Sequence, residues 1–261
     1  MKQLKILLWF LVRPRYWQYF LYFVSWRLRN LRESHNTAEE RAAASAWCEQ
    51  NAVDRSAALK QIIGTADIPS FEETYQDLLK TAMEVVSQTT IPMGGGSDME
   101  LIYQAAEHVQ ATRVIETGVA FGWSSLAFLL SLRHRPGSRL VSTDLAYPRG
   151  NSEQYVGCVV PPDLRHLWTL IPYPDRQALP KALKQLPEID VCHYDSDKSY
   201  EGRLWAYPRL WKALRSGGIF ISDDIGDNLG FRDFCALAGQ KPIIFKYKTR
   251  YIGVLVKPPS S

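Results

Sequence analysis

Acidic side chains follow two apolar runs in the C-terminal half of the sequence. Asp195 ends the run 189–194, and Asp223 and Asp224 end the run 219–222. If both runs are parallel strands, their carboxyl ends reach the same edge of one sheet. Three carboxylates there repel one another unless a cation neutralises them, and hard oxygen ligands suit Mg²⁺ or a similar divalent ion. The spacing predicts a metal site formed by Asp195, Asp223 and Asp224.

A basic side chain stands close to these carboxylates. Lys198 follows Asp195 by three residues, and it could remove a proton from a substrate if a cation or burial lowers its pKa. A metal-bound hydroxyl would be easier to deprotonate. The alternative is that Lys198 belongs to a solvated helix start. His193 lies within an apolar strand and is more simply a core histidine than a ligand, while Asp197 could cap the next helix.

A glycine-containing turn follows an earlier apolar run, 113–116. Gly118 permits a tight turn, and Gly122 would let backbone approach a ligand where a helix starts. The G-x-x-x-G spacing differs from the G-x-G-x-x-G that holds a pyrophosphate, which disfavours a dinucleotide. A turn built only for packing is the alternative. Asp144, after the second run, could accept hydrogen bonds from ribose hydroxyls or act as a cap, and Asp175 could lie at an adenine-side loop or in a plain loop.

The elements that must position these residues alternate between strand and helix, which predicts a parallel sheet with helices on both faces. The runs 242–248 and 251–257 are joined only by Thr249 and Arg250, so they must pair as an antiparallel hairpin. Upstream, 37–87 is helix-like, and Ser97 or Asp98 could cap a helix through Val109. The other predicted strands are 113–116, 139–143, 168–171, 189–194 and 219–222, and the predicted helices are 71–86, 124–132, 177–185 and 200–214.

The N-terminal segment differs from the rest of the chain. Residues 1–32 hold seven Lys and Arg residues, no acid, and nine of the aromatic side chains. Its apolar runs are too short to span a bilayer, and a helix is expected from Pro14 to about Arg32. The segment could lie on an anionic membrane surface, or it could pack on its own domain or on the sister subunit of a homodimer. We expect three parts: a basic aromatic segment at 1–35, a helical cap region at 36–98 and a ligand-binding domain at 99–261.

Charge and cysteine usage restrict the partners and the location. Without the basic N-terminus the chain is slightly acidic, which disfavours nucleic acid as a partner. The four cysteines form no C-x-x-C pair, as in a protein with reduced thiols. We expect a cytoplasmic location, with a peripheral position on the cytoplasmic membrane face as the alternative.

From about Pro92 to Lys257 the chain resembles class I S-adenosylmethionine-dependent methyltransferases, namely the catechol and caffeoyl-CoA type and the macrocin and cephalosporin-pathway type of O-methyltransferases. Three motifs in the correct order carry this resemblance: 115–127 with its G-x-x-x-G-x-S-S core, Asp195-Ser196-Asp197-Lys198, and Gly217-Gly218 to Asp224. It implies a Rossmann-like, doubly wound α/β fold whose mostly parallel, seven-stranded sheet ends in an antiparallel C-terminal hairpin, with a helical N-terminal extension.

The resemblance also implies roles for individual residues. Glu116, Gly118 and Gly122 would line the methionine side of the cofactor, Asp144 would hold its ribose, and Asp195, Asp223 and Asp224 would bind Mg²⁺ or another divalent cation. Lys198 stands at the position of the catalytic lysine or histidine, with Asp195 beside it. Several relatives carry asparagine where this chain has Asp224, which leaves the metal preference open. The residues implied in binding S-adenosylmethionine are Glu116, Thr117, Gly118, Ala120, Phe121, Gly122, Ser124, Ser125, Asp144 and Asp175.

The predicted function is metal-assisted O-methylation of a hydroxyl on a small molecule or glycan. Two alternatives are a metal-independent methyltransferase of the same fold and a membrane-attached binding or scaffold protein with a degenerate Rossmann-like fold. The acceptor pocket is expected to form from the variable segments 71–98, 147–162 and 226–234. Its aromatic side chains are expected to include Trp123, Tyr147 and Tyr155.

Overall fold

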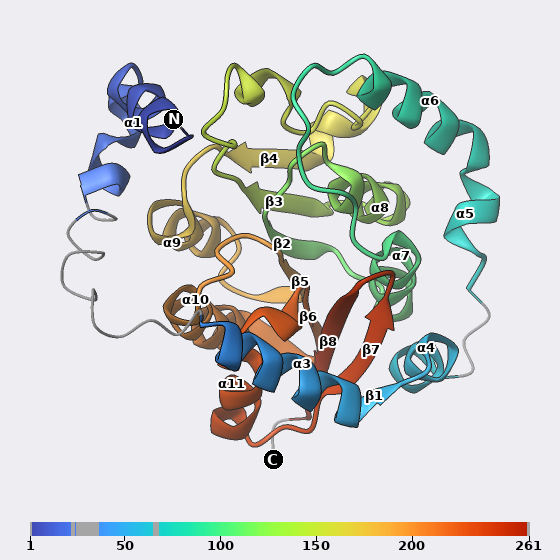
Figure 1. The fold of residues 1–261 in the computed structure, drawn as a ribbon. Coiled ribbons are helices and arrows are strands. Elements are labelled where there is room, and N and C mark those ends of the chain that lie inside the picture. The colour runs from blue at the N-terminus through green and yellow to red at the C-terminus, as the bar shows by residue number, and fades with distance from the viewer. Residues whose placement is uncertain (1, 22–23, 25–36, 65–67, 260–261) are drawn as a thin grey trace.

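A central eight-stranded sheet organises the molecule (Figure 1). The computed structural model describes residues 2–21, 24, 37–64 and 68–259. The strand order is β1-β7-β8-β6-β5-β2-β3-β4, and every neighbouring pair is parallel except those that β8 makes with β6 and β7. The strands are β1 (Ala52–Val53), β2 (Arg113–Thr117), β3 (Arg139–Thr143), β4 (Trp168–Ile171), β5 (Ile189–Tyr194), β6 (Leu214–Ser222), β7 (Ile243–Tyr247) and β8 (Arg250–Val256).

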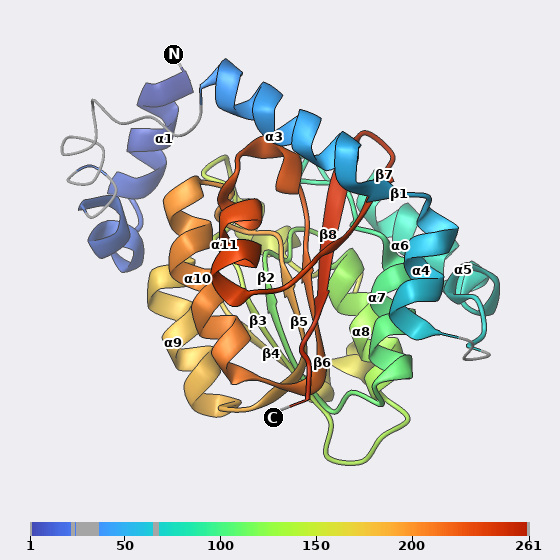
Figure 2. The same ribbon diagram turned by 90° about the horizontal axis from the view of Figure 1, so that it is seen from below.

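Helices cover both faces of this sheet, as Figure 2 shows. The predicted doubly wound, mostly parallel α/β fold with an antiparallel C-terminal hairpin is confirmed. One face carries α4 (Arg55–Ile63), α5 (Phe71–Thr74), α6 (Gln76–Ser87), α7 (Met99–His108) and α8 (Trp123–Leu132), and the other carries α9 (Asp175–Gln185), α10 (Tyr200–Ala213) and α11 (Gly230–Ala238). Helix α3 (Ala38–Asn51) lies across one end of the sheet.

The central strands form because their side chains are buried on both faces. All six residues of β5 are buried, and β2 and β3 are buried apart from their first residues. Continuous apolar runs of this kind are typical of parallel strands between two helical layers. The two layers give two separate apolar clusters, one under α7 and α8 and one under α9 and α10. The sheet is therefore a rigid support for the loops at its edges.

Several local predictions differ from the structure. The link of the terminal hairpin is Lys248–Thr249 and not Thr249–Arg250, because Arg250 pairs with Tyr247 as the first residue of β8. The strand predicted at 219–222 begins earlier, at Leu214. The sheet has eight strands and not seven, because Ala52 and Val53 pair in parallel with β7 at the edge. The predicted helix 71–86 is divided into α5 and α6 at Tyr75. Asp197 does not cap α10, because the N-cap is Ser199, whose hydroxyl accepts a hydrogen bond from the backbone N–H of Gly202 at 3.0 Å.

Of the two N-caps predicted for the helix through Val109, Asp98 takes the role in α7. Its Oδ1 accepts a hydrogen bond from the backbone N–H of Leu101 at 3.1 Å. The second carboxylate oxygen of Asp98 pairs with the guanidinium of Arg55. The cap thereby ties α7 to α4, and it leaves the neighbouring Ser97 available for another contact.

The N-terminal arm, defined here as residues 2–21, folds back on the molecule. It contains α1 (Lys2–Leu11) and a short 3-10 helix, Pro14–Tyr16, and most of the helix expected from Pro14 to Arg32 lies outside the described residues. Trp9, Phe10 and Tyr16 are buried against Ala146. Packing on its own domain, one of the alternatives left open by the sequence, is therefore what the described arm shows. In the described part of the chain, no helix combines the length and apolar character needed to cross a membrane.

Candidate active site

The predicted functional residues meet at the carboxyl edge of β2, β3, β5 and β6. Backbone hydrogen bonds connect the strand ends there: the N–H of Gly118 donates to Thr143 O at 2.8 Å, and that of Asp195 donates to Thr117 O at 2.8 Å. The N–H of Asp223 donates to Tyr194 O at 3.0 Å. Loops far apart in the sequence therefore begin side by side at one rim, as the strand alternation predicts.

At each of the two glycines in the turn after β2, a different backbone segment lies too close for a side chain. Gly118 has φ +83°, and a Cβ there would collide with the backbone carbonyl of Asp195. Gly122 has φ +96°, and a Cβ would lie 2.8 Å from the Cα of Gly157. The backbone that approaches Gly122 is thus that of a loop in the same chain and not a ligand, because Gly157 occupies the space next to it.

Asp144, at the end of β3, has one carboxylate oxygen that is satisfied and one that is not. Its Oδ1 accepts a hydrogen bond from the backbone N–H of Val119 at 2.9 Å. Its Oδ2 is buried, and among the described residues it has no hydrogen-bond partner. Burial raises the pKa of this carboxyl to about 6, against the opposing hydrogen bonds from Val119 and Ala120. An unpaired buried acceptor costs free energy, and a ligand hydroxyl would satisfy it.

A cavity of about 580 Å³ opens at this rim. Its volume is in the range of small-molecule sites. Of the residues predicted to bind the cofactor, those that line it are Gly118, Ala120, Ser124, Asp144 and Asp175. Those that do not line it are Glu116, Thr117, Phe121, Gly122 and Ser125.

Glu116 lies beneath the cavity floor. Its side chain is fully buried, and its Oε2 accepts hydrogen bonds from Ser125 Oγ at 2.5 Å and Ser142 Oγ at 2.7 Å. Similarly, Thr117 Oγ1 accepts a hydrogen bond from Ser196 Oγ at 2.8 Å, and that hydroxyl also lies 2.5 Å from Asp175 Oδ2. These polar groups support the rim from below, so their part in binding is indirect in this structure.

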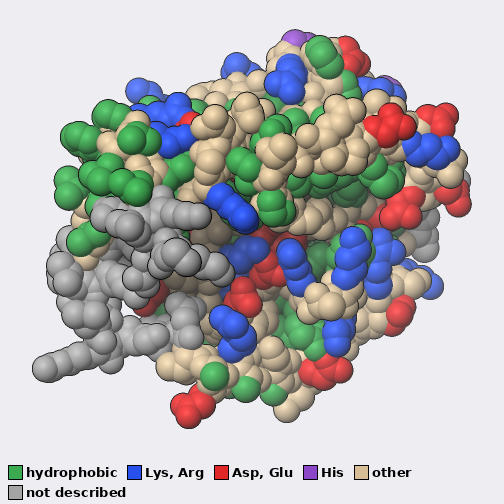
Figure 3. All heavy atoms as spheres, turned by 45° about the horizontal axis from the view of Figure 1, so that its top comes forward, with side chains coloured by type: hydrophobic (Ala, Val, Ile, Leu, Met, Phe, Trp, Pro, Cys, Tyr) green, Lys and Arg blue, Asp and Glu red, His purple; other side chains and the backbone are tan. Residues whose placement is uncertain are grey.

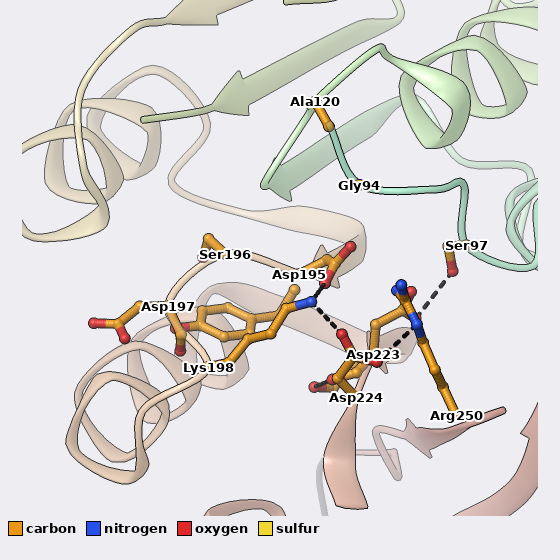
Figure 4. A network of polar contacts seen from close by, with 12 residues as sticks. Gly94, Ser97, Ala120, Asp195, Ser196, Asp197, Lys198, Asp223, Asp224 and Arg250 are labelled. Carbon is orange, nitrogen blue, oxygen red and sulfur yellow. Dashed lines mark hydrogen bonds and ion pairs between the residues drawn. The ribbon is translucent and has the colours of Figure 1, made fainter. Parts of the chain in front are cut away.

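Lys198 lies between two of the predicted metal ligands (Figure 4). Its Nζ is 3.0 Å from Asp195 Oδ1 and also pairs with Asp224 Oδ2. Arg250, the first residue of β8, adds a second cation, with its Nε 3.4 Å from Asp224 Oδ1. Asp195 and Lys198 line the cavity, whereas Asp223 and Asp224 do not. The negative charge at the rim is thus balanced by side chains of the same chain.

These ion pairs set the direction of the pKa shifts. Burial lowers the pKa of Lys198, but Asp195 and Asp224 outweigh it and hold the pKa above its ordinary value. The condition under which Lys198 would act as a base, a lowered pKa, is therefore not met in this arrangement. Burial and the nearby Asp223 raise the pKa of Asp195, against the effect of Lys198. The carboxylate of Asp195 is accordingly the better proton acceptor of the pair.

Asp223 points to partners of its own. Its Oδ1 accepts a hydrogen bond from Ser97 Oγ at 2.9 Å (Figure 4). The same oxygen lies 3.5 Å from His193 Nε2. The other ring nitrogen of His193 lies 3.8 Å from Glu116 Oε1. Burial opposes protonation of the imidazole, but Asp223 and Glu116 raise the pKa of His193 to about 10. His193 is therefore a core residue whose imidazole lies between two buried carboxylates, and these favour its protonated form.

The three predicted metal ligands do not share one coordination sphere in this arrangement. In the part of the chain that the structure describes, no three His, Cys, Asp or Glu side chains are grouped so that they could hold a metal ion. Lys198 occupies the space between Asp195 and Asp224, and Asp223 is engaged by Ser97 and His193. As arranged, the donor set does not fit a divalent cation.

Several residues of the site were not predicted from the sequence. Ser97 and Arg250 bind Asp223 and Asp224, and the fully buried Arg203 donates through Nη2 to the backbone carbonyl of Asp224 at 2.7 Å. The sequence predicts Arg250 in the link of the terminal hairpin, but in the structure Arg250 is the first residue of β8. Arg203 lies in the predicted helix 200–214, and no pattern in the sequence indicates that its guanidinium is buried against Asp224.

The expected acceptor segments contribute unequally. Gly94, Gly95, Gly96 and Ser97 line the cavity, and so do Tyr147 and Pro148, whereas 226–234 does not. Of the expected aromatic residues, Trp123 and Tyr147 line it and Tyr155 does not. Tyr19 of the N-terminal arm and Trp205 of α10 also line it. The cavity wall on this side thus includes residues 94–97, the loop after β3, the arm and α10.

Comparisons with known proteins agree with this geometry. Residues 115–225 match the family model described as a methyltransferase domain, and no curated protein sequence matches the chain. Among solved structures, a methyltransferase from Geobacter sulfurreducens is 18% identical, with a TM-score of 0.54 over 79% of this chain and 98% of that one. The O-methyltransferase TomG from Streptomyces achromogenes, solved with SAM, is 18% identical, with a TM-score of 0.51 over 80% and 98%.

A third solved structure is the O-methyltransferase from Bacillus cereus in complex with SAH, which is 15% identical, with a TM-score of 0.50 over 80% of this chain and all of that one (100%). At such identities the similarity shows the fold. The matched residues 115–225 include part of β2, the turn and the helix α8 that follow it, Asp144, Asp195 and the Asp223–Asp224 pair. Residues 115–225, less than half of the chain, therefore match a methyltransferase domain, and the chain as a whole has the same fold as these solved structures.

Proposed function

We propose that this protein is an S-adenosylmethionine-dependent O-methyltransferase that acts on a hydroxyl of a small molecule or glycan. The observation that carries the proposal is a single cavity of about 580 Å³ that joins the Gly118 turn and Asp144 to Asp195 and Lys198. A methyl donor and an acceptor hydroxyl must meet in one space. The SAM and SAH complexes of structures with this fold support the choice of cofactor.

The cofactor would lie along the rim of β2 and β3. The free Oδ2 of Asp144 would accept hydrogen bonds from the ribose hydroxyls, and the turn at Gly118 would leave room for the amino-acid portion. Asp175 begins α9 and lines the cavity, and it would lie toward the adenine side of the cofactor. The sulfonium supplies an already activated methyl group, so the protein need only align the acceptor oxygen and handle its proton.

The residues beside the cavity suit that task. The Asp195 carboxylate would accept the hydroxyl proton as the new C–O bond forms. The Lys198 ammonium, held by Asp195 and Asp224, would stabilise negative charge on the acceptor oxygen. Asp224 and Arg250 would keep Lys198 in position. Lys198 would thus contribute as a fixed positive charge and not as a base.

The role of a divalent metal divides two versions of this function. The ammonium between Asp195 and Asp224 supports the metal-independent version, because the chain itself supplies the cation. The metal-assisted version, expected from the sequence, is the second candidate, because these two carboxylates already converge on one positive charge. Methyl transfer that persists after EDTA treatment and dialysis would support the first version. Loss of activity that Mg²⁺ restores would support the second.

The function itself is tested first by cofactor binding. Native mass spectrometry of the freshly purified protein should detect bound S-adenosylmethionine or S-adenosylhomocysteine, and calorimetry should measure both. Formation of S-adenosylhomocysteine with a panel of phenols, sugars and lipid-linked sugars would then identify the acceptor class. A protein that binds neither nucleoside would contradict the proposal and would favour the alternative of a degenerate binding or scaffold protein.

A further inference from the structure

The N-terminal arm has an inner face that is fixed to the methyltransferase domain. Trp9, Phe10 and Tyr16 are 5%, 6% and 0% exposed, and the indole N–H of Trp9 donates to Gly150 O at 2.9 Å. Glu153 accepts a hydrogen bond from Tyr16 Oη at 3.1 Å and forms ion pairs with Arg13 and Arg15. The arm is therefore held against the loop that follows β3.

The outer face of the same arm is apolar, and the described residues leave it exposed. Six of the eleven exposed large hydrophobic side chains in the described residues lie between positions 6 and 21. Leu8 is 52% exposed, Leu11 51%, Val12 70% and Leu21 66%. Figure 3 shows hydrophobic side chains gathered at the left of the view, where Figure 1 places α1. We call the set Leu8, Leu11, Val12, Trp17 and Leu21 the outer apolar face.

The arm that carries this face also borders the cavity. Tyr19, two residues before Leu21, lines the cavity together with Leu145 and Tyr147. Tyr147 is itself 43% exposed, so apolar surface also occurs at the mouth. Whatever covers the outer apolar face consequently binds an element that also forms part of the cavity wall.

The charge of the segment indicates what covers it. The described arm, residues 2–21, contains four basic residues, Lys2, Lys5, Arg13 and Arg15, and no acidic one. In a symmetric dimer the arm would meet its own copy, so these like charges would be brought together. An anionic lipid surface instead accepts apolar side chains and attracts basic ones, with each cation near the surface adding about 1 kcal/mol.

We infer that the outer apolar face docks the protein on an anionic lipid bilayer and brings the cavity mouth toward that surface. Resting on the proposed function, the inference also specifies the acceptor class: a hydroxyl compound held in the membrane by a lipid portion, such as a lipid-linked glycan, which would reach the cavity past Tyr19 and Tyr147.

The test is vesicle flotation with the full-length chain, using phosphatidylcholine vesicles with and without phosphatidylglycerol. The variant Leu8→Gln/Leu11→Gln/Val12→Gln removes apolar contact without touching a buried residue. Its partition onto phosphatidylglycerol vesicles should fall by at least about tenfold, since each leucine loses several buried methylene equivalents. The matched control, Met83→Gln/Leu237→Gln, changes side chains that are 56% and 78% exposed on other helices and should bind as the wild type does.

Each other result counts against the inference. A wild-type chain that does not float, or a triple variant that floats equally well, overturns it, and equal binding to phosphatidylcholine alone overturns the charge argument. A wild-type dimer in sedimentation that the triple variant loses, without vesicle binding, assigns the face to a second copy. Cofactor calorimetry without vesicles keeps the two proposals apart: flotation without S-adenosylmethionine binding would refute the proposed function and leave the docking intact.

Discussion

Asp144 is the residue whose unpaired oxygen most directly calls for a ligand. Its Oδ1 is bound by Val119 and its Oδ2 is buried without a partner among the described residues. In Asp144→Asn, Oδ1 can still accept from Val119, but an amide N–H₂ replaces the free acceptor and the charge is lost. Hydrogen bonds to charged groups contribute about 1.5–3 kcal/mol, so S-adenosylmethionine should bind roughly 10- to 100-fold more weakly in calorimetry.

The stability of the same variant separates binding from folding. Removing a buried carboxylate that has one unsatisfied oxygen should leave the thermal midpoint unchanged or higher. Asp54→Asn is the matched control, because Asn also serves as an N-cap and Asp54 is away from the cavity. Unchanged cofactor affinity in Asp144→Asn would remove Asp144 from the binding site.

Lys198 provides the second test at the level of single residues. Lys198→Met leaves Asp195 and Asp224 without their shared cation. Methyl transfer should fall by about a hundredfold or more, the usual effect of losing a charge-stabilising group, while the Kd of S-adenosylmethionine changes little. Lys198→Arg, which keeps the charge, should recover part of the rate. Equal rates in Lys198→Met and wild type, in an assay with an identified acceptor, would contradict the role.

The sequence predicted which side chains reach the rim but not how they pair. Asp195, Asp223 and Asp224 follow two strands, so topology alone brings them to one edge. The pairing depends on details that no spacing encodes: Asp224 has φ +52°, and the buried Arg203 holds its carbonyl. As a result, the ammonium of Lys198 lies where the sequence predicted a metal ion, and Asp223 contacts Ser97 and His193.

At the scale of elements, the turn after β2 depends on the absence of a side chain at Gly118. A Cβ there would collide with the carbonyl of Asp195 at the end of β5, whereas a Cβ at Gly137 would have no neighbour within 4 Å. Both glycines have positive φ, +83° and +76°, so the two alanine variants share the backbone strain and differ in the collision. Gly137→Ala should cost about 1 kcal/mol in urea unfolding.

Gly118→Ala should cost clearly more than Gly137→Ala and should also abolish cofactor binding in calorimetry, since the ends of β2 and β5 must separate. A Gly118→Ala variant as stable as Gly137→Ala, with normal S-adenosylmethionine affinity, would show that the rim adjusts without loss.

Asp190 connects elements at the opposite end of the sheet. Burial raises its pKa, but hydrogen bonds from the backbone N–H groups of Thr112 and Arg113 and from the guanidinium groups of Arg215 and Arg113 outweigh burial. They lower the pKa of Asp190 to about 2 from an ordinary value of 3.8. A carboxyl with a depressed folded-state pKa stabilises the fold above its unfolded pKa, and the contribution is lost as the pH falls through about 4 toward 2.

The corresponding experiment compares wild type with Asp190→Asn in urea unfolding at several pH values. The wild type should be more stable by about 2 kcal/mol at neutral pH, and the difference should shrink as the pH falls below about 4. Glu188→Asn is a suitable control, since the Glu188 side chain is 58% exposed and pairs only at the surface with Arg113. A difference that stays constant with pH would contradict the depressed pKa.

Strands were predicted correctly where the apolar pattern was long and clear, and a strand was missed where it was too short to show a pattern. Strands β2 to β6 and the terminal hairpin could be recognised because each is an apolar run bounded by turns or polar residues. Strand β1 is only Ala52 and Val53, which lie between two helices and carry no alternation. Its pairing with β7 is set by the tertiary position of α3 and α4, which a local pattern does not contain.

At the scale of the whole molecule, the open question from sequence was what the aromatic N-terminus contacts. Composition could not distinguish the domain from a membrane, because both accept aromatic and apolar side chains. In the structure the two kinds of contact belong to different faces of the arm. Trp9, Phe10 and Tyr16 are buried against the domain, whereas Leu8, Leu11 and Val12 are exposed. The arm therefore attaches to the domain through one set of residues and leaves another set for docking.

The attachment of the arm centres on Glu153, which contacts Arg13, Arg15 and Tyr16. Glu153→Gln removes the charge that these groups share while keeping the shape of the side chain. The loss of roughly 1 kcal/mol from partly exposed ion pairs should raise amide hydrogen exchange in residues 9–16 about fivefold and leave β2 and β5 unchanged. Glu73→Gln, an exposed change on α5, should alter neither region.

Because Tyr19 of the same arm lines the cavity, release of the arm in Glu153→Gln should also weaken binding of the acceptor more than binding of the cofactor. Unchanged exchange in 9–16 would mean that the apolar contacts of Trp9 and Phe10 hold the arm without Glu153.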